Sequence, residues 1–169
     1  MGDVFKEQII KRKPTFRDTL FRILLIVAAG LVFMIAFIFV PAFGAIIGFA
    51  AIFGAWFAMS YLNVEYEYVF TNGELDIDII YNRSRRKRIF SQHVNKFDIM
   101  AHIDDNARAG EFSGAQEVRN YTSGETNENT YAFLTTLDSK RVKVIIEPNE
   151  KMLKAIATVL TRRKLFVKQ

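Results

Sequence analysis

Two long apolar runs dominate the first third of the chain. Residues 23–64 contain no Asp, Glu, Lys, Arg or His, and Pro41 and Gly44 interrupt them. As helices, residues 23–40 and 45–62 would each be about 27 Å long, close to the thickness of about 30 Å of a bilayer hydrocarbon core. Proline and glycine between the runs indicate a tight connection. The pattern predicts two transmembrane helices joined as a hairpin.

Two rival structures fit this pattern less well. A cleaved signal peptide is disfavoured because a second apolar run follows the first at once and a long segment precedes both. A re-entrant or surface-lying hairpin is disfavoured because lipid-exposed backbone must satisfy its own hydrogen bonds. The spanning hairpin is therefore the working hypothesis.

The second apolar run carries small residues on one helical face. Their spacing of three or four positions allows the close approach of another helix. The first interpretation is packing against the first run of the same chain, and the alternative is self-association into a homo-oligomer. This candidate helix-packing face consists of Gly44, Gly48, Ala51, Ala55 and Ala58.

From residue 64 onward the periodicity is that of strands. Apolar and polar positions alternate on both sides of Asn72-Gly73, a dipeptide typical of a two-residue β-hairpin turn. About seven strands are expected, over residues 64–71, 74–81, 87–91, 96–103, 117–122, 130–137 and 141–147. An amphipathic helix over residues 149–162, with Asn149 as its N-cap, follows them.

These patterns divide the chain into three parts. Residues 1–22 form a basic cytoplasmic or interfacial N-terminus, in which residues 4–12 are predicted to be a short interfacial helix. Thr15 is the expected N-cap of the first long helix, with Asp18 completing a capping box. Residues 23–62 are the hairpin and residues 63–169 a cytoplasmic domain. The expected fold class is an α+β membrane protein with an antiparallel sheet domain.

Charge sets the expected orientation in the membrane. The formal net charge is +5, and most of the excess precedes the first apolar run. The positive-inside rule then places the N-terminus in the cytoplasm, and two spans return the C-terminal domain to the same side. The protein is expected in the cell (inner or plasma) membrane as a multi-pass protein. The topology-setting basic residues are Lys11, Arg12, Lys13, Arg17 and Arg22.

A second basic cluster lies between two predicted strands. One interpretation is ion pairing with Glu74, Asp76 or Asp78 on the neighbouring strand. The other is contact with anionic lipid headgroups, since each basic residue near an anionic surface gains about 1 kcal/mol. Nucleic-acid binding is not expected, because aromatic side chains are not interleaved with the basic ones. The candidate lipid-contact residues are Arg83, Arg85, Arg86, Lys87 and Arg88.

Catalytic and metal-binding patterns are sparse. The chain has no cysteine, which excludes disulfides and thiol chemistry. Its two histidines, His93 and His102, do not have the spacing of a metal site. No glycine-rich phosphate loop is present, and Ser91 and His93, a conceivable nucleophile and base, have no third orienting group. We expect no catalytic residue, no metal ion and no cofactor.

The chain resembles a known protein family over nearly its full length. The stretches that carry the resemblance are residues 1–9, 60–82, 84–88 and 145–161. They are similar to a family of small two-span membrane proteins from Gram-positive, Clostridia-type bacteria. The part after the apolar runs resembles bacterial pleckstrin-homology-like (PH-like) domains. The resemblance implies a PH-like fold and a membrane location, and the family has no assigned activity.

Eukaryotic relatives of this fold often bind inositol phospholipids through basic residues in the loop after the first strand. Here that loop is expected to be the Asn72-Gly73 turn, which contains no Lys or Arg. Inositol phospholipid binding of that kind is therefore not expected.

The sequence thus predicts a non-enzymatic, membrane-anchored interaction module that presents a PH-like domain at the cytoplasmic membrane face. Its expected ligand is a protein partner or anionic lipid. The alternative is an accessory subunit or regulator of a larger membrane protein complex, associating through its transmembrane helices.

Overall fold

The chain folds into two units whose segments alternate along the sequence. The computed structural model describes residues 4–160, 165 and 166. The first unit, called the sheet unit, consists of Met1–Lys13, Glu65–Ile80 and Arg86–Gln169. The second, called the hairpin unit, consists of Pro14–Val64 and Tyr81–Arg85.

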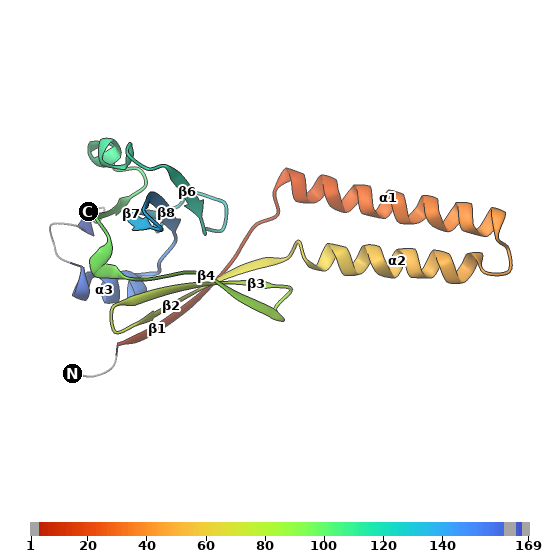
Figure 1. Cartoon of the computed structure of the whole chain (residues 1–169), viewed down its shortest axis with the longest axis horizontal. Helices are drawn as coiled ribbons and strands as arrows, with labels where there is room; N and C mark the ends of the chain where they lie inside the picture. The colour runs from red at the N-terminus through yellow and green to blue at the C-terminus, as the bar shows by residue number, and fades with distance from the viewer. Residues whose placement is uncertain (1–3, 161–164, 167–169) are drawn as a thin grey trace. The chain divides into compact units, whose positions relative to one another are not determined.

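Two helices lie side by side in the hairpin unit (Figure 1). They are α1 (Phe16–Phe39) and α2 (Gly44–Ser60). The predicted capping box of α1 is confirmed: Thr15 Oγ1 accepts from the Asp18 N–H at 3.3 Å, and Asp18 Oδ2 accepts from the Thr15 N–H at 2.8 Å. This cap starts α1 at Phe16, as predicted, so the helix begins before the predicted membrane span of residues 23–40.

Small residues allow α2 to approach α1 closely. Gly44, Gly48 and Ala55 are the buried residues of α2. A Cβ added at Gly48 would lie 2.1 Å from the Phe33 ring, and one at Gly44 would lie 2.5 Å from the Ala36 carbonyl oxygen. Because real Cβ atoms essentially never come this close to other atoms, both positions require glycine for the observed packing.

The surface of α1 is apolar and mostly uncovered. Within the described part of the chain, α1 is the one helix long and apolar enough to cross a membrane by length and composition, and α2 is apolar but shorter. Only 11% of the most apolar window of α1 is buried. A core helix of a soluble protein buries far more of its apolar surface.

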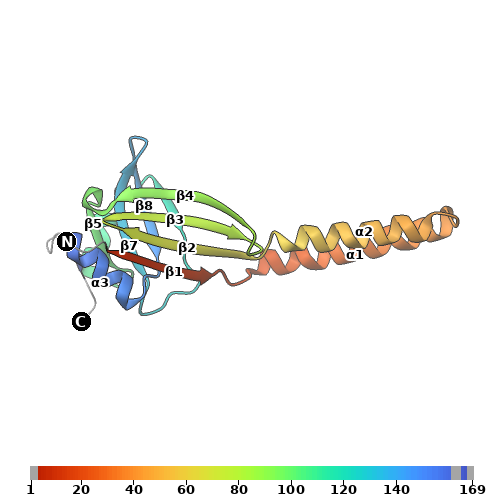
Figure 2. The ribbon, with the colours of Figure 1, turned by 90° about the horizontal axis from the view of Figure 1, so that it is seen from below.

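Four strands form the first sheet, in the order β1-β2-β3-β4 (Figure 2). Their bounds are β1 (Phe5–Lys11), β2 (Val64–Thr71), β3 (Glu74–Tyr81) and β4 (Arg85–His93). β1 pairs antiparallel with β2, from Phe5 opposite Thr71 to Lys11 opposite Glu65.

This pairing corrects the prediction for the N-terminus. The interfacial helix expected over residues 4–12 is wrong, because Phe5–Lys11 form β1. The basic segment 1–22 is likewise not a separate part, since its described residues up to Lys13 belong to the sheet unit. The first connection of the sheet is therefore the stretch that holds α1 and α2, and the Asn72-Gly73 turn is the second.

The Asn72-Gly73 turn has the predicted conformation. Asn72 has φ 49° and Gly73 has φ 95°, as a two-residue hairpin turn requires. On β3 the predicted alternation holds only in its first half. Leu75 and Ile77 are buried, but beyond them Asp78 and Ile80 are more buried than Ile79.

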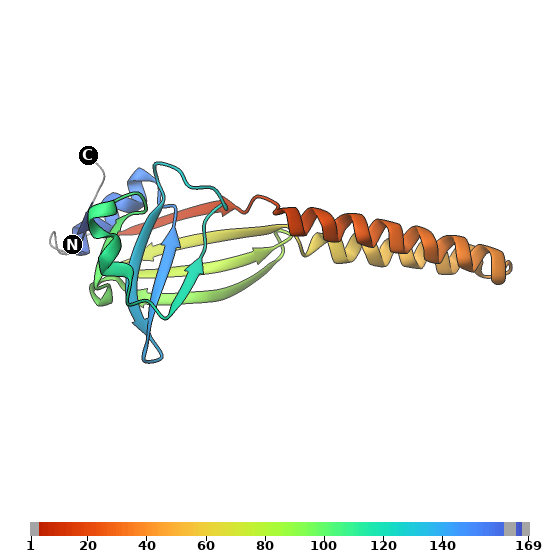
Figure 3. The same cartoon turned by 90° about the horizontal axis from the view of Figure 1, so that it is seen from above.

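Five strands form the second sheet, in the order β6-β8-β7-β5-β9, and β7 and β8 cross the direction of the first sheet (Figure 3). The strands are β5 (Ile99–His102), β6 (Glu117–Asn120), β7 (Tyr131–Leu137), β8 (Lys140–Ile146) and β9 (Leu165–Phe166). β6 runs parallel to β8 and β9 parallel to β5, so this sheet is mixed rather than wholly antiparallel.

The described residues thus form nine strands. Each of the seven predicted ranges overlaps one of them, and β1 and β9 were not predicted. The polar stretch 104–129 is ordered into η2 (Asn106–Phe112) and β6, and a second 3-10 turn, η1 (Val94–Lys96), precedes β5.

Helix α3 (Glu150–Val159) contacts β1 and η1. The predicted N-cap is confirmed, since Asn149 Oδ1 accepts from the Met152 N–H at 2.8 Å. The helix ends at Val159, and the predicted end at residue 162 lies outside the described residues.

In the core the rings of Phe97 and Phe133 stack with centroids 4.0 Å apart.

Tyr68 links the first sheet to the ends of two strands of the second sheet. Its side chain is fully buried. The hydroxyl donates to the Tyr121 carbonyl at 2.7 Å, beyond the end of β6, and accepts from the Glu147 N–H at 3.2 Å, beyond the end of β8. Burial raises the pKa of this phenol, so it stays a neutral hydrogen-bonding group.

We expect Gly48→Leu to separate α1 from α2, because the new side chain would overlap the Phe33 ring. Overpacking of this kind costs about 1–3 kcal/mol. The measurement is the amount of SDS that unfolds the full-length protein in mild detergent, followed by tryptophan fluorescence. Gly30→Leu is the control, since nothing lies within 4 Å of a Cβ added there. Equal losses in the two variants would contradict the packing role of Gly48.

Candidate functional site

A ladder of charged side chains crosses β2, β3 and β4. Arg86 Nη2 lies 2.7 Å from Glu67 Oε1. Arg88 Nε lies 3.0 Å from Asp78 Oδ1, and its Nη1 lies 3.0 Å from Asp76 Oδ2. Two of the five candidate lipid-contact residues, Arg86 and Arg88, therefore pair with acids of the same sheet. The partners of Arg88 are two of the acids that the ion-pair interpretation named.

Glu67 is an acid that the sequence pattern placed on the solvent side of β2. Its side chain is only 1% exposed. Burial and contact with the carboxyl group of Glu7 raise the pKa of Glu67, and the Arg86 guanidinium opposes this shift. The first sheet therefore contains a buried carboxyl group that holds its proton more tightly than a glutamate in water.

This environment predicts a pH dependence of stability. The folded chain binds the Glu67 proton more tightly than the unfolded chain, so the free energy of unfolding falls as pH rises from the ordinary value of 4.5 through the raised pKa. We expect Glu67→Gln to flatten this fall, since the amide still offers an acceptor to Arg86. Thermal unfolding of the full-length protein, followed by far-ultraviolet circular dichroism across this pH range, measures the effect.

The control for that experiment is Glu117→Gln. Glu117 is paired with Arg119, which lowers its pKa, so its own contribution has the opposite sign. A fall in stability that persists in Glu67→Gln, or disappears in Glu117→Gln, would show that another group is responsible.

The remaining members of the basic cluster lie differently. Asn82 and Arg83 form a two-residue turn with φ of 48° and 56°, and the Asn82 N–H donates to the Asn63 carbonyl at 2.8 Å. The Arg85 guanidinium lies 5.5 Å from the ring centroid of Tyr61, just beyond α2. Lys87 is exposed on β4. Arg83 and Arg85 thus belong to the hairpin unit, and lipid contact by Arg83, Arg85 and Lys87 stays a prediction.

The topology-setting basic residues are divided between the two units. Lys11, Arg12 and Lys13 end or follow β1, and Lys13 forms an ion pair with Glu125 in the sheet unit. Arg17 and Arg22 lie in the first two turns of α1. Only the latter pair is carried by the hairpin itself.

The candidate helix-packing face is also divided. Gly44, Gly48 and Ala55 are buried against α1, whereas Ala51 and Ala58 are half-buried. Beside them lies an apolar groove of about 220 Å³ between the two helices. It is lined by Leu25, Ala28, Ala29, Val32, Ala51, Gly54 and Ala55.

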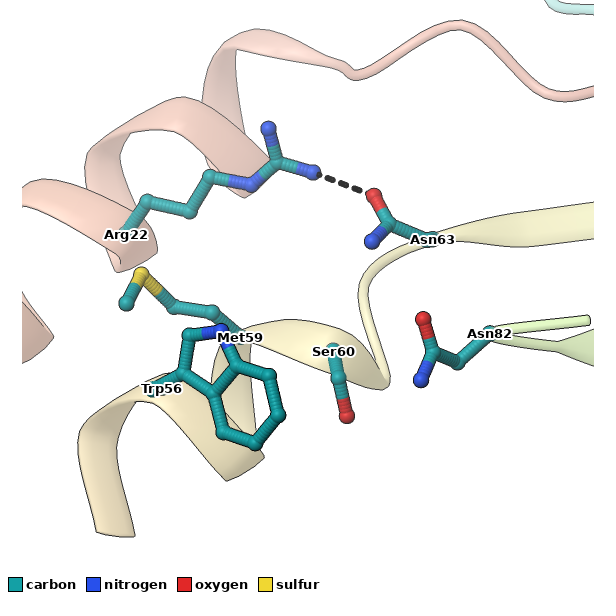
Figure 4. A pocket seen from close by; sticks show the side chains of 6 residues that line it. All are labelled: Arg22, Trp56, Met59, Ser60, Asn63 and Asn82. Atoms are coloured by element: carbon teal, nitrogen blue, oxygen red, sulfur yellow. Dashed lines mark hydrogen bonds between the residues drawn. The ribbon is translucent and has the colours of Figure 1, made fainter. Parts of the chain in front are cut away.

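A second hollow of about 300 Å³ lies within the hairpin unit, where α1 begins and α2 ends (Figure 4). Arg22 Nη2 donates to Asn63 Oδ1 at 3.0 Å. Two hydrogen bonds fix the backbone of Asn63. Its N–H donates to the Ser60 carbonyl at 3.3 Å, and its carbonyl accepts from the Asn82 N–H. The lining residues are Arg22, Trp56, Met59, Ser60, Asn63 and Asn82.

The hollow combines one positive charge with amide groups and an apolar wall. Its lining includes no acidic side chain. The Ser60 hydroxyl donates to the Phe57 carbonyl at 2.6 Å, so it presents acceptor lone pairs rather than its proton. The guanidinium of Arg22 and the amides of Asn63 and Asn82 offer hydrogen-bond donors that could bind an acceptor-rich group.

The sequence analysis singled out Arg22 only as a topology-setting residue and did not connect it with the other residues that line the hollow. Asn63 and Asn82 lie in two separate turns, and no local pattern links them to α1. One signal was present: Trp56, the single tryptophan of the chain, lies near the end of the second apolar run. Tryptophan at such a position is typical of a membrane interface.

Comparison with known proteins gives one family match. The family is described as a bacterial PH-like domain (DUF6106), and the match spans residues 2–166. Neither the curated proteins nor the solved structures provide a significant match.

Proposed function

The chain belongs to the bacterial PH-like domain family DUF6106, and on this basis we propose that it is a non-enzymatic interaction module held at a membrane by its helical hairpin. PH-like domains are generally non-catalytic binding domains. The charged ladder and the hollow fit this role, since both are built for ion pairing and hydrogen bonding rather than for proton transfer to a substrate.

The apolar surface of α1 is the observation that carries the proposal. Phe37, Ile38 and Phe39 are 59%, 62% and 77% exposed, and most apolar residues along the helix are similarly uncovered. Soluble monomers rarely expose contiguous apolar patches larger than a few hundred Å². A bilayer is the solvent that suits such a surface, and α2 supplies the second apolar helix of the same hairpin.

Sheet pairing supports an even number of membrane crossings. The chain leaves the sheet after β1 and returns to it at β2, and Lys11 lies opposite Glu65 at that edge. A segment whose two ends belong to one strand pair starts and finishes on the same side of a membrane. The basic residues Arg17 and Arg22 then favour the cytoplasmic side for the PH-like domain, by the positive-inside rule.

Cysteine labelling tests this topology without background, because the natural chain has no cysteine. The test sites are Ala42→Cys, in the turn between α1 and α2, and Glu128→Cys, in the sheet unit; both residues are exposed. We expect a membrane-impermeant maleimide to label Ala42→Cys in intact cells and Glu128→Cys only after lysis. Labelling of both sites only after lysis would overturn the spanning hairpin.

We propose further that Arg83, Arg85 and Lys87 contact anionic lipid headgroups. Arg83 lies in the turn whose Asn82 N–H donates to Asn63, which lies shortly after the end of α2, and Arg85 follows that turn on β4. A fragment that begins at residue 63 would lack β1, so the full-length protein is the material for the test.

The test is an environment-sensitive fluorophore on Ser84→Cys in lipid nanodiscs. We expect anionic lipid to shift its emission to the blue relative to neutral lipid, and salt to reduce the shift. Arg85→Gln with Lys87→Gln should abolish the shift. Lys151→Gln with Lys154→Gln, on α3, removes the same charge and should leave it unchanged. Equal effects of the two variants would mean that net charge, and not this turn, is responsible.

The alternative is an accessory subunit or regulator of a larger membrane complex. The groove between α1 and α2 favours it, because Gly54 has nothing within 4 Å of an added Cβ and leaves room for a helix of another protein. A hydrodynamic mass in mild detergent that corresponds to the chain alone would count against this alternative and against a homo-oligomer.

A further inference from the structure

The hollow at the open end of the hairpin has the position of a headgroup site. Arg22 is the last charged residue before the apolar run, and Asn63 follows the end of α2. Trp56 and Met59 extend the lining toward the apolar part of α2. Polar and apolar lining residues therefore meet at the level where the hydrophobic surface of the hairpin ends.

Arg22 is held in place while most of its donors remain available. One Nη2–H bonds Asn63 Oδ1 at 3.0 Å, and a guanidinium carries five N–H donors in one plane. In the described part of the chain no carboxylate forms an ion pair with Arg22. A planar, oriented guanidinium without an acid is well suited to bidentate recognition of a phosphate.

The two asparagine side chains add donors beside it. The Oδ1 of Asn63 is occupied by Arg22, so the Nδ2 group is the part of this amide left for a ligand. In Figure 4 the amide of Asn63 is directed toward Arg22 and that of Asn82 toward Ser60. The hollow thus offers several N–H donors and one positive charge, with no acid among its lining residues.

The apolar wall determines which phosphate compound fits. Trp56 is 60% exposed and lies beside Met59 on α2. A free phosphate ion would use the donors but not this wall. A volume of about 300 Å³ is at the small end of ligand sites, which suits a phosphate headgroup whose hydrocarbon chains leave the hollow along the helices.

We propose that this hollow binds the phosphate of one anionic glycerophospholipid molecule. Arg22 and Asn63 donate to the phosphate oxygens, and the acyl chains lie along Trp56, Met59 and the neighbouring helix surface. The inference rests on the proposed membrane anchoring, since a bilayer supplies the lipid. It adds a single defined site to the diffuse contact expected for the basic turn.

Trp56 provides a reporter inside the site, because it is the only tryptophan of the chain. The full-length protein in mild detergent is mixed with small amounts of phosphatidylglycerol or phosphatidylcholine that carry the same brominated acyl chains. Bromine quenches tryptophan fluorescence on contact. We expect stronger quenching by phosphatidylglycerol at equal mole fraction, and saturation at low mole fraction.

Arg22→Gln should reduce this preference for phosphatidylglycerol about fivefold to tenfold, as expected for loss of a charge-assisted contact to phosphate. Arg17→Gln is the matched control, because it removes the same charge from the same helix outside the hollow. Arg22→Lys keeps the charge without the planar fork and should give an intermediate loss, so the test survives a disturbance of the hairpin by glutamine. The SDS titration above reports whether each variant keeps its hairpin.

Three results would overturn the proposal. The first is equal quenching by the two lipids. The second is an equal loss of the preference for phosphatidylglycerol in Arg17→Gln and Arg22→Gln. The third is that inorganic phosphate relieves the quenching as effectively as unbrominated phosphatidylglycerol does. The last would assign the same donors to a free phosphate. Because the experiment needs no bilayer, its failure leaves the cysteine-labelling result, and hence the proposed anchoring, unaffected.

Discussion

The pairing of β1 with β2 is the contact on which the rest of the structure depends. These strands are neighbours in the sheet, yet the whole helical hairpin lies between them in the chain. Closing a connection of this length costs only slightly more entropy than closing a short one, and packed helices shorten the effective span. The pairing therefore lets a PH-like sheet accommodate an apolar hairpin without losing its first strand.

Polar contacts divide the basic residues into two functional groups. Arg86 and Arg88 hold acids on β2 and β3, so they stabilise the sheet and have little charge to offer a ligand. Arg22 and Arg85 have an amide and an aromatic ring as partners instead. A guanidinium opposite a neutral group keeps its charge for an external anion, which is why the proposed lipid contacts lie in the hairpin unit rather than on the ladder.

Local signals in the sequence were sufficient for most of the fold. The capping residues Thr15 and Asn149 and the Asn72-Gly73 turn act within a few residues, so reading them needs no knowledge of distant contacts. β1 was misread because its residues are mostly exposed and its partner lies beyond the hairpin. The burial of Glu67 and the hollow around Arg22 depend on side chains from several separate segments. The periodicity of apolar residues along one segment carries no information about such long-range contacts.

The place of the hairpin between the first two strands also imposes an order on biosynthesis. Translation delivers about 5–20 residues per second, so β1 waits for several seconds, unpaired, while the hairpin is made and leaves the ribosome. Its partner strand becomes available only when the second helix is complete. Under the proposed membrane anchoring, a hairpin inserted with its ends on opposite sides would leave β2 without its edge strand β1, so completion of the first sheet depends on correct insertion.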